Sequence, residues 1–395
     1  MNRTDRLGRF FRYWMALGLF LQLAGLCFVP DGSRYTTIAN LSLFLPALLS
    51  LPLFRPWTQW SRSSILWLLA LLFWVLGVAL LNEGSEGGAV RWLRVTLYAW
   101  LYVSAISVVM QDRVLWNRLL GAVVLVCGLF AALSLVQALF IEERGWTFRA
   151  FRLASWGGHE MADFRNPIVS ALYFGMLLLV ALHLASRSAG VLRWLYSLAA
   201  ALMLAYLYFT YSRGVWAAGV VGAFVLFWSP ADRRTAVRWL LATASLVLII
   251  LLWLGWNKAV DMSFRDVIFY GWWHQIQAFW LWGFGAGADA NICISELNRC
   301  FNQAHSLYLQ FTFEYGLPGL LLLLAFVWVL TRNGLRLRGH DDMATLALAL
   351  VAFMLVSAVA NYYVIFLRPG VFWMVFWVPA GMLVAMSSRL CVERV

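Results

Sequence analysis

Apolar residues run through this chain in long blocks that are separated by short polar or basic connections. The blocks at 64–81, 115–140 and 236–256 each contain at most one charged residue. A helix needs about 20 apolar residues to cross the hydrocarbon core of a bilayer. The pattern therefore predicts about twelve membrane-spanning helices along the chain.

The predicted spans cover the whole chain, and no stretch between them has the composition of a soluble domain. They lie near 13–29, 36–54, 64–81, 89–110, 115–140, 167–186, 190–210, 214–229, 236–256, 306–330, 343–366 and 370–388. With 63% hydrophobic and 12% charged residues, the chain cannot hide its apolar surface in a soluble core. We expect an all-α polytopic membrane protein in which residues 1–395 form a single integral membrane domain.

The basic residues predict the orientation. Arginine gathers in every second connection and near both ends of the chain, and such connections lie on the cytoplasmic side of a membrane. Both termini are then cytoplasmic, and the inner side accounts for the whole net charge of +12. Because this charge is a topology signal, it does not point to nucleic acid as a partner.

Two connections on the outer face are long, at about 141–166 and about 257–305. Long ordered loops in a compact protein usually carry function, so we expect the chemistry on this face. Cys293 and Cys300 share the second loop, and they suit a disulfide if the outer face is an oxidising periplasm; two free thiols are the alternative.

The second outer loop contains an amphipathic pattern. Aromatic and aliphatic residues recur at helical spacing after Ser263, so residues 264–281 are predicted to form a helix at the membrane surface. Arg265 then lies in the first turn, where unpaired N–H groups and the positive end of the helix dipole favour an anion. A solvated arginine paired with Asp261 or Asp266 is the alternative.

Further outer-face residues are candidates for binding a substrate. Arg213 lies between two spans with almost no loop, where a cation serves either as a membrane anchor or as an anion contact. Gly285 and Gly287 belong to GFGAGA (283–288), which permits close approach of a backbone to a ligand. The remaining candidates are Arg152 of the first long loop, Arg368 before Pro369, His274 and Glu314.

The sequence predicts neither a metal nor another cofactor. HEMAD (159–163) resembles a zinc-protease motif, but its fifth residue is aspartate rather than histidine. No D-x-D motif, which nucleotide-sugar enzymes use to hold a metal, occurs in the chain.

His305 and Glu314 open the span near 306–330. A neutral imidazole at this boundary can accept a proton from a hydroxyl, or it can serve as a polar anchor. Glu314 is nine residues further on, about 13 Å along an ideal helix, so it does not orient His305 directly. A helix break near Gly316 and Pro318 would change that geometry.

Three groups of residues together resemble the superfamily of O-antigen ligases and O-antigen polymerases. HSLYL (305–309) followed by EYG (314–316) and Gly319 resembles its signature. YSRG (211–214) resembles a second element, and Arg265 with the glycines of 283–287 resembles a third. The resemblance is strong over residues 195–330, although family members often carry a proline before the glycines where this chain has FWLWG.

This resemblance implies a metal-independent glycosyltransferase with its active site on the periplasmic face of a bacterial inner membrane. The donor would be a glycan on undecaprenyl diphosphate, and the acceptor of a ligase would be a sugar hydroxyl of lipid A–core. Arg213 and Arg265 would hold the diphosphate, and His305 would accept the proton of the acceptor.

Three other functions have to be weighed against a ligase. An O-antigen polymerase and a protein O-oligosaccharyltransferase would use the same donor with another acceptor. A twelve-helix transporter would have charges near the span centres and related halves, whereas the sequence has few central charges and no repeat.

Overall fold

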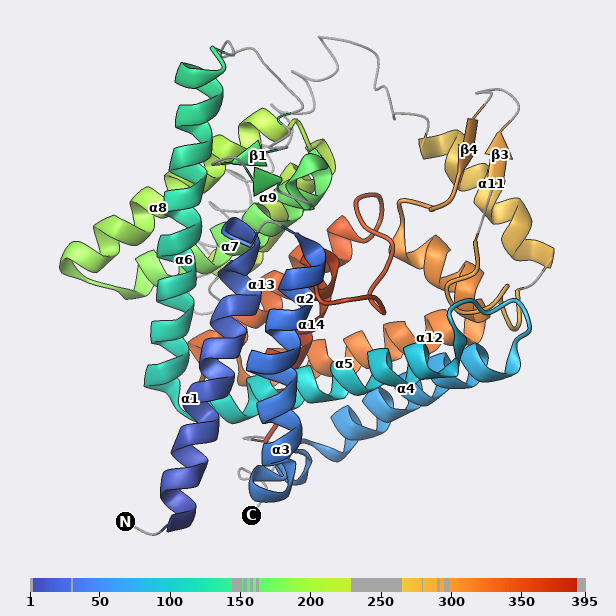
Figure 1. Cartoon of the computed structure of the whole chain (residues 1–395), viewed down its shortest axis with the longest axis horizontal. Helices are drawn as coiled ribbons and strands as arrows, with labels where there is room; N and C mark the ends of the chain where they lie inside the picture. Colours follow the sequence, from blue (N-terminus) through green and yellow to red (C-terminus); the bar gives the residue numbers. More distant parts are fainter. Residues whose placement is uncertain are drawn as a thin grey trace.

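The computed structural model describes residues 3–29, 31–143, 151, 155–156, 159–160, 163–228, 265–278, 280–289, 292–294 and 299–388. Helices dominate this part of the chain (Figure 1). They are α1 (Arg3–Ala24), α2 (Gly32–Ala39), α3 (Leu45–Phe54), α4 (Arg62–Leu81), α5 (Gly88–Met110), α6 (Arg113–Val136), α7 (Pro167–Arg187), α8 (Gly190–Thr210), α9 (Arg213–Phe227), α11 (Arg265–Ala278), α12 (Leu307–Leu337), α13 (Asp342–Ser357) and α14 (Val371–Met386). Two small antiparallel hairpins pair β1 (Ser155–Trp156) with β2 (His159–Glu160) and β3 (Ile292–Ile294) with β4 (Arg299–Phe301). The predicted all-α fold class is confirmed.

The described residues contain eight helices that are long and apolar enough to cross a membrane, together with the three shorter apolar helices α9, α13 and α14. The chain is therefore an integral membrane protein. The span predicted near 236–256 lies outside the described residues. The span predicted at 343–366 was too long, because the helix ends at Ser357 although the apolar composition continues beyond it.

The helix predicted at 264–281 in the second long loop is present as α11, and its position at the membrane surface stays a prediction. Its residues Ile268, Trp272 and Ile276 are buried in a small apolar cluster with Ala304 and Phe313. This cluster packs α11 against the beginning of α12. In Figure 1, α11 and the β3–β4 hairpin lie together at one end of the layer that α4, α5 and α12 form.

The long helix α12 is broken at Gly316, whose φ of 69° and ψ of 176° are not helical. The break frees backbone groups that lipid cannot satisfy, so the protein has to supply partners for them. The N–H of Leu317 donates to the carbonyl of Trp280 at 2.7 Å, and the carbonyl of Phe313 accepts from the N–H of Phe284 at 2.7 Å. The loop after α11 thus takes the place of the missing helical turn.

Two further carbonyls at the break are satisfied in the same way. Glu314 faces Pro318, which has no N–H, and its carbonyl accepts from the N–H of Gly285 at 3.2 Å instead. The carbonyl of Tyr315 accepts from the indole of Trp74 on α4 at 2.9 Å. These four backbone groups at the break therefore each have a partner from another segment.

Alanine at Gly316 is expected to destabilise the protein. The left-handed φ disfavours a side chain, and a Cβ there would lie 2.2 Å from the carbonyl oxygen of Leu281. Strain and overpacking of this kind cost about 1–3 kcal/mol each. We expect Gly316→Ala to lower the melting temperature of the detergent-purified protein clearly. Gly77→Ala on α4 is the control, since a Cβ there meets nothing within 4 Å; equal melting of the two variants would contradict the strain at the break.

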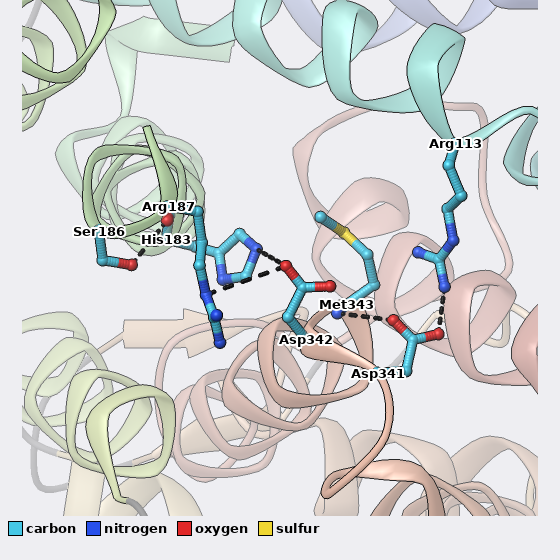
Figure 2. Close-up of polar contacts among 7 residues, drawn as sticks. All are labelled: Arg113, His183, Ser186, Arg187, Asp341, Asp342 and Met343. Carbon is cyan, nitrogen blue, oxygen red and sulfur yellow. Dashed lines mark hydrogen bonds and ion pairs between the residues drawn. The ribbon is translucent and has the colours of Figure 1, made fainter. Parts of the chain in front are cut away.

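Two consecutive aspartates connect the beginning of α13 to α6 and α7 (Figure 2). Asp341 caps α13 by accepting from the N–H of Met343 and pairs with Arg113 of α6. Asp342 faces α7, where its Oδ2 lies 3.8 Å from Nε2 of His183 and 3.9 Å from Nε of Arg187. Sixteen helical residues, or about 24 Å at 1.5 Å per residue, separate this contact from the other end of α13.

Candidate functional site

The turn before α9 holds Arg213. Tyr211 has a left-handed φ of 54°, and α9 begins two residues later at Arg213. The hydroxyl of Ser212 donates to the carbonyl of Pro167, at the start of α7, at 3.2 Å. The guanidinium of Arg213 donates to the Tyr211 hydroxyl at 3.0 Å and lies 4.8 Å from the centre of its ring. The orientation of the Arg213 side chain is therefore set by Tyr211 of the same turn.

The turn before α12 has the same backbone feature at His305, whose φ is also 54°. Left-handed residues other than glycine cost about 1–3 kcal/mol and persist only where the surroundings enforce them. After His305, the N–H of Leu307 donates to the carbonyl of Ala358 at 2.9 Å. Before it, the N–H of Ala304 donates to the side-chain oxygen of Gln310 at 3.1 Å. The histidine is thus held from both sides.

The connection after α13 brings these two turns together. Ala358 contacts the His305 turn through its carbonyl, and Asn361 lies one turn further along the chain. A Cβ added to Gly214 would come within 2.5 Å of the Asn361 amide nitrogen, so this side chain packs directly on the Arg213 turn. Asn361 is buried, and its side chain forms no hydrogen bond with any described residue.

Arg265 lies close to His305. It begins α11, and the next turn of that helix packs with Ala304 in one apolar cluster. Burial, together with the positive charge of Arg265, lowers the pKa of His305 below its ordinary value of 6.5. Burial also lowers the pKa of the Arg265 guanidinium, which reflects the cost of removing a cation from water. A bound anion would offset that cost.

The electrostatics at this end of the helices favour a negatively charged ligand. Arg213 and Arg265 are each the first residue of a helix in the described part of the chain, where the helix dipole adds positive potential. No carboxylate in the described ranges pairs with either guanidinium. Two half-buried cations without a carboxylate partner among the described residues, beside a neutral imidazole, are suited to hold a phosphate while a proton is removed nearby.

The glycine loop, residues 283–287, packs against the break in α12 and supplies hydrogen-bond partners there. Gly283, Gly285 and Gly287 all have left-handed φ values, and a Cβ at Gly283 would lie 2.6 Å from the backbone of Glu314. A Cβ at Gly285 would lie 2.5 Å from the backbone of Gly84, in the loop between α4 and α5. The close backbone approach that the glycines permit is therefore made to the protein itself, and substrate binding at Gly285 and Gly287 stays a prediction.

Glu314 is buried in contact with this loop. Its two carboxylate oxygens accept from the N–H of Gly287 at 3.2 Å and from the amide of Gln310 at 2.7 Å. The predicted break in α12 is present, but it follows Glu314 and does not bring the carboxylate to His305. A direct role of Glu314 in binding a substrate stays a prediction.

The other predicted residues have different neighbours or lie outside the described residues. His274 is exposed on α11, with its ring 4.5 Å from that of Tyr270. Arg368 packs against Gly32 at the start of α2. Arg152 falls outside the described residues. Cys293 and Cys300 face each other across β3 and β4 and form a disulfide.

Sequence reasoning did not find Gln310, Ala358 or Asn361. Gln310 carried a usable signal, since it precedes Glu314 by four residues and such pairs share one face of a helix. Ala358 and Asn361 had none, because their partners are distant in the chain.

Comparison with known proteins addresses the segment that carries these turns. Residues 198–324 match the family model described as O-antigen ligase. The resemblance seen in YSRG, Arg265 with the glycines, and the histidine motif is thereby confirmed. A search among curated proteins finds no match. The O-antigen ligase match supports a membrane glycosyltransferase of the ligase and polymerase superfamily, and the residues of the candidate site outside it are Ala358 and Asn361.

Proposed function

We propose that this protein transfers a glycan from undecaprenyl diphosphate to a sugar hydroxyl of lipid A–core at the periplasmic face of a bacterial inner membrane. The observation that carries the proposal is the meeting of the Arg213 turn and the His305 turn at the connection after α13, with Arg265 beside His305. This places two cations and one base at the same end of the helices, within the O-antigen ligase segment.

The chemistry is a displacement at the anomeric carbon of the donor. The acceptor oxygen forms a bond to this carbon, and the bond between the carbon and the diphosphate oxygen breaks. The electron pair leaves with the diphosphate, where Arg213 and Arg265 stabilise the growing negative charge. Their fixed positions at two helix N-termini mean that little reorganisation is needed during the reaction.

His305 accepts the proton of the acceptor hydroxyl. Its lowered pKa keeps the imidazole neutral at pH 7 and therefore able to act as a base. In the described part of the chain the imidazole forms no hydrogen bond. The side chain is thus free to contact a substrate, whereas its backbone is fixed.

An apolar groove supports a donor with a long hydrocarbon chain. It has a volume of about 760 Å³ and is lined by residues of α7, α8 and α9, among them Tyr208, Val215 and Trp216. Val215 and Trp216 belong to the first turn of α9, directly after Arg213. A diphosphate at Arg213 would therefore place an attached isoprenoid chain at this groove.

Reconstitution tests this function. Purified protein is mixed with lipid-linked glycan and lipid A–core, with and without EDTA, and glycan transfer is followed by mass shift of the acceptor. We expect transfer without nucleotide and with no loss in EDTA, since no group of three or more metal-ligating side chains occurs among the described residues. Longer glycan on the donor lipid, with unmodified lipid A–core, would identify a polymerase instead. Loss of transfer in EDTA with rescue by one divalent ion would overturn the metal-independent mechanism.

A further inference from the structure

The left-handed turn at His305 needs hydrogen bonds that hold the backbone on both sides of it. After His305, the carbonyl of Ala358 accepts from the N–H of Leu307 and, at 3.4 Å, from the hydroxyl of Ser306. Before His305, the structure offers one polar contact, from the N–H of Ala304 to the side chain of Gln310. Ala304 is fully buried, so its N–H has no water to turn to and depends on this contact.

The Gln310 amide can support Ala304 only in one orientation. Its oxygen has to face the N–H of Ala304, and its NH₂ group then points to Glu314. An amide can be flipped with little change in shape, so its orientation is set by what its partners can donate or accept. The Glu314 oxygen next to Gln310 accepts from the NH₂ group at 2.7 Å, and this contact leaves the amide oxygen for Ala304.

The second carboxylate oxygen of Glu314 accepts from the N–H of Gly287. Both oxygens thus have a donor, and the buried carboxylate links the glycine loop to the histidine turn. Glu314 and Gln310 are both buried, and neither forms a hydrogen bond with the His305 side chain in the described part of the chain. The hydrogen bonds that lead from Glu314 towards His305 run through Gln310 and the backbone of Ala304.

We propose that Glu314 is a positioning residue that fixes the His305 turn through Gln310, and that it does not contact the substrate. The proposal rests on the proposed function, in which His305 is the base. The proposal explains how Glu314 can influence a histidine nine residues away. One hydrogen bond joins Glu314 to Gln310, and a second joins Gln310 to Ala304, which precedes His305.

A swap of the two side chains tests this directly. In Glu314→Gln, an NH₂ group replaces one of the two carboxylate oxygens and cannot accept a hydrogen bond. The contact with either Gly287 or Gln310 is therefore lost. In Gln310→Glu, two carboxylates face each other across a hydrogen-bond distance. The double variant restores all contacts: the carboxylate at 310 accepts from Ala304 and from the amide at 314, whose oxygen accepts from Gly287.

We expect each single variant to lower kcat about tenfold or more, with the KM for the donor nearly unchanged, and the double variant to recover most of the rate. The control is Thr312→Val, since this buried hydroxyl donates only to the Tyr308 carbonyl of its own helix. Its kcat should stay near that of the wild type. A raised donor KM with unchanged kcat in Glu314→Gln would indicate substrate contact and overturn the proposal.

A second measurement separates positioning from general stabilisation. Glu314→Gln is combined with His305→Ala, and the residual transfer rate is compared with that of His305→Ala alone. If Glu314 acts through His305, the added change has no further effect. The same tenfold loss in both backgrounds would refute the positioning role. A wild-type rate in His305→Ala would refute the role of His305 as the base. A wild-type rate in Glu314→Gln, with the rate of His305→Ala lowered, would refute only the positioning role of Glu314.

Discussion

His305→Ala is expected to lower the rate of glycan transfer by roughly 10²–10⁴, the usual contribution of a positioned general base. The protein should remain folded and inserted, because the turn is held by backbone and Gln310 contacts rather than by the imidazole. Donor binding should persist, since the arginines carry it. Transfer is measured as the mass shift of lipid A–core in the reconstituted assay.

The control for this variant is His340→Ala. His340 is exposed in the connection between α12 and α13, about the length of a membrane span away from the site. It should transfer glycan at the wild-type rate. Retention of most of the rate by His305→Ala would reduce His305 to a polar anchor at the beginning of α12.

Arg265→Ala is expected to cut transfer tenfold to more than a hundredfold, which corresponds to about 1.5–3 kcal/mol of lost charge-assisted contact. Arg265→Lys should recover little of this rate, because a point charge cannot replace a bidentate contact with a diphosphate. Arg193→Ala is the control, since this arginine is exposed at the beginning of α8. A wild-type rate in Arg265→Ala would remove the residue from the site.

The pH profile of the same variants carries independent information. His305 acts as a base only when it is neutral, so the rate falls as the pH drops through its pKa. In the wild type this acid limb should lie below the ordinary value of 6.5, because burial and the charge of Arg265 lower the pKa. Arg265→Ala removes that charge and should move the limb to higher pH, whereas Arg265→Lys keeps it. An acid limb that is identical in wild type and Arg265→Ala would show that the two side chains do not interact.

The hydrophobic pattern predicted the helices well because a bilayer leaves a segment few ways to satisfy its backbone. It misjudged residues 358–366, where an apolar composition continues after the helix has ended at Ser357. Composition reports that a segment is buried or in lipid, but it does not report whether the segment is helical there. The error fell on the connection that bears Ala358 and Asn361.

Arg213, Arg265 and His305 could be proposed from the sequence because each lies in a local motif with a backbone consequence. Their arrangement was not predictable, since it depends on contacts between distant segments. The carbonyl of Ala358 and the amide of Gln310 decide how His305 is held, and neither residue type signals that role. The glycines were predicted to permit close approach of a ligand. In the structure Gly283 and Gly285 approach Glu314 and Gly84, and ligand binding at Gly285 and Gly287 stays a prediction.

The dependence of the His305 turn on Ala358 has a consequence for biosynthesis. The chain emerges from the ribosome with Arg213, Arg265 and His305 in place long before residue 358 is made, and domains form as their segments become available. A nascent chain that ends at residue 324, where the family match ends, contains all three motifs but lacks the carbonyl that holds Leu307. If His305 is the base, as proposed, we expect glycan transfer to begin only after α13 and Ala358 have been synthesised and inserted, so that an incomplete chain would not act on the donor lipid.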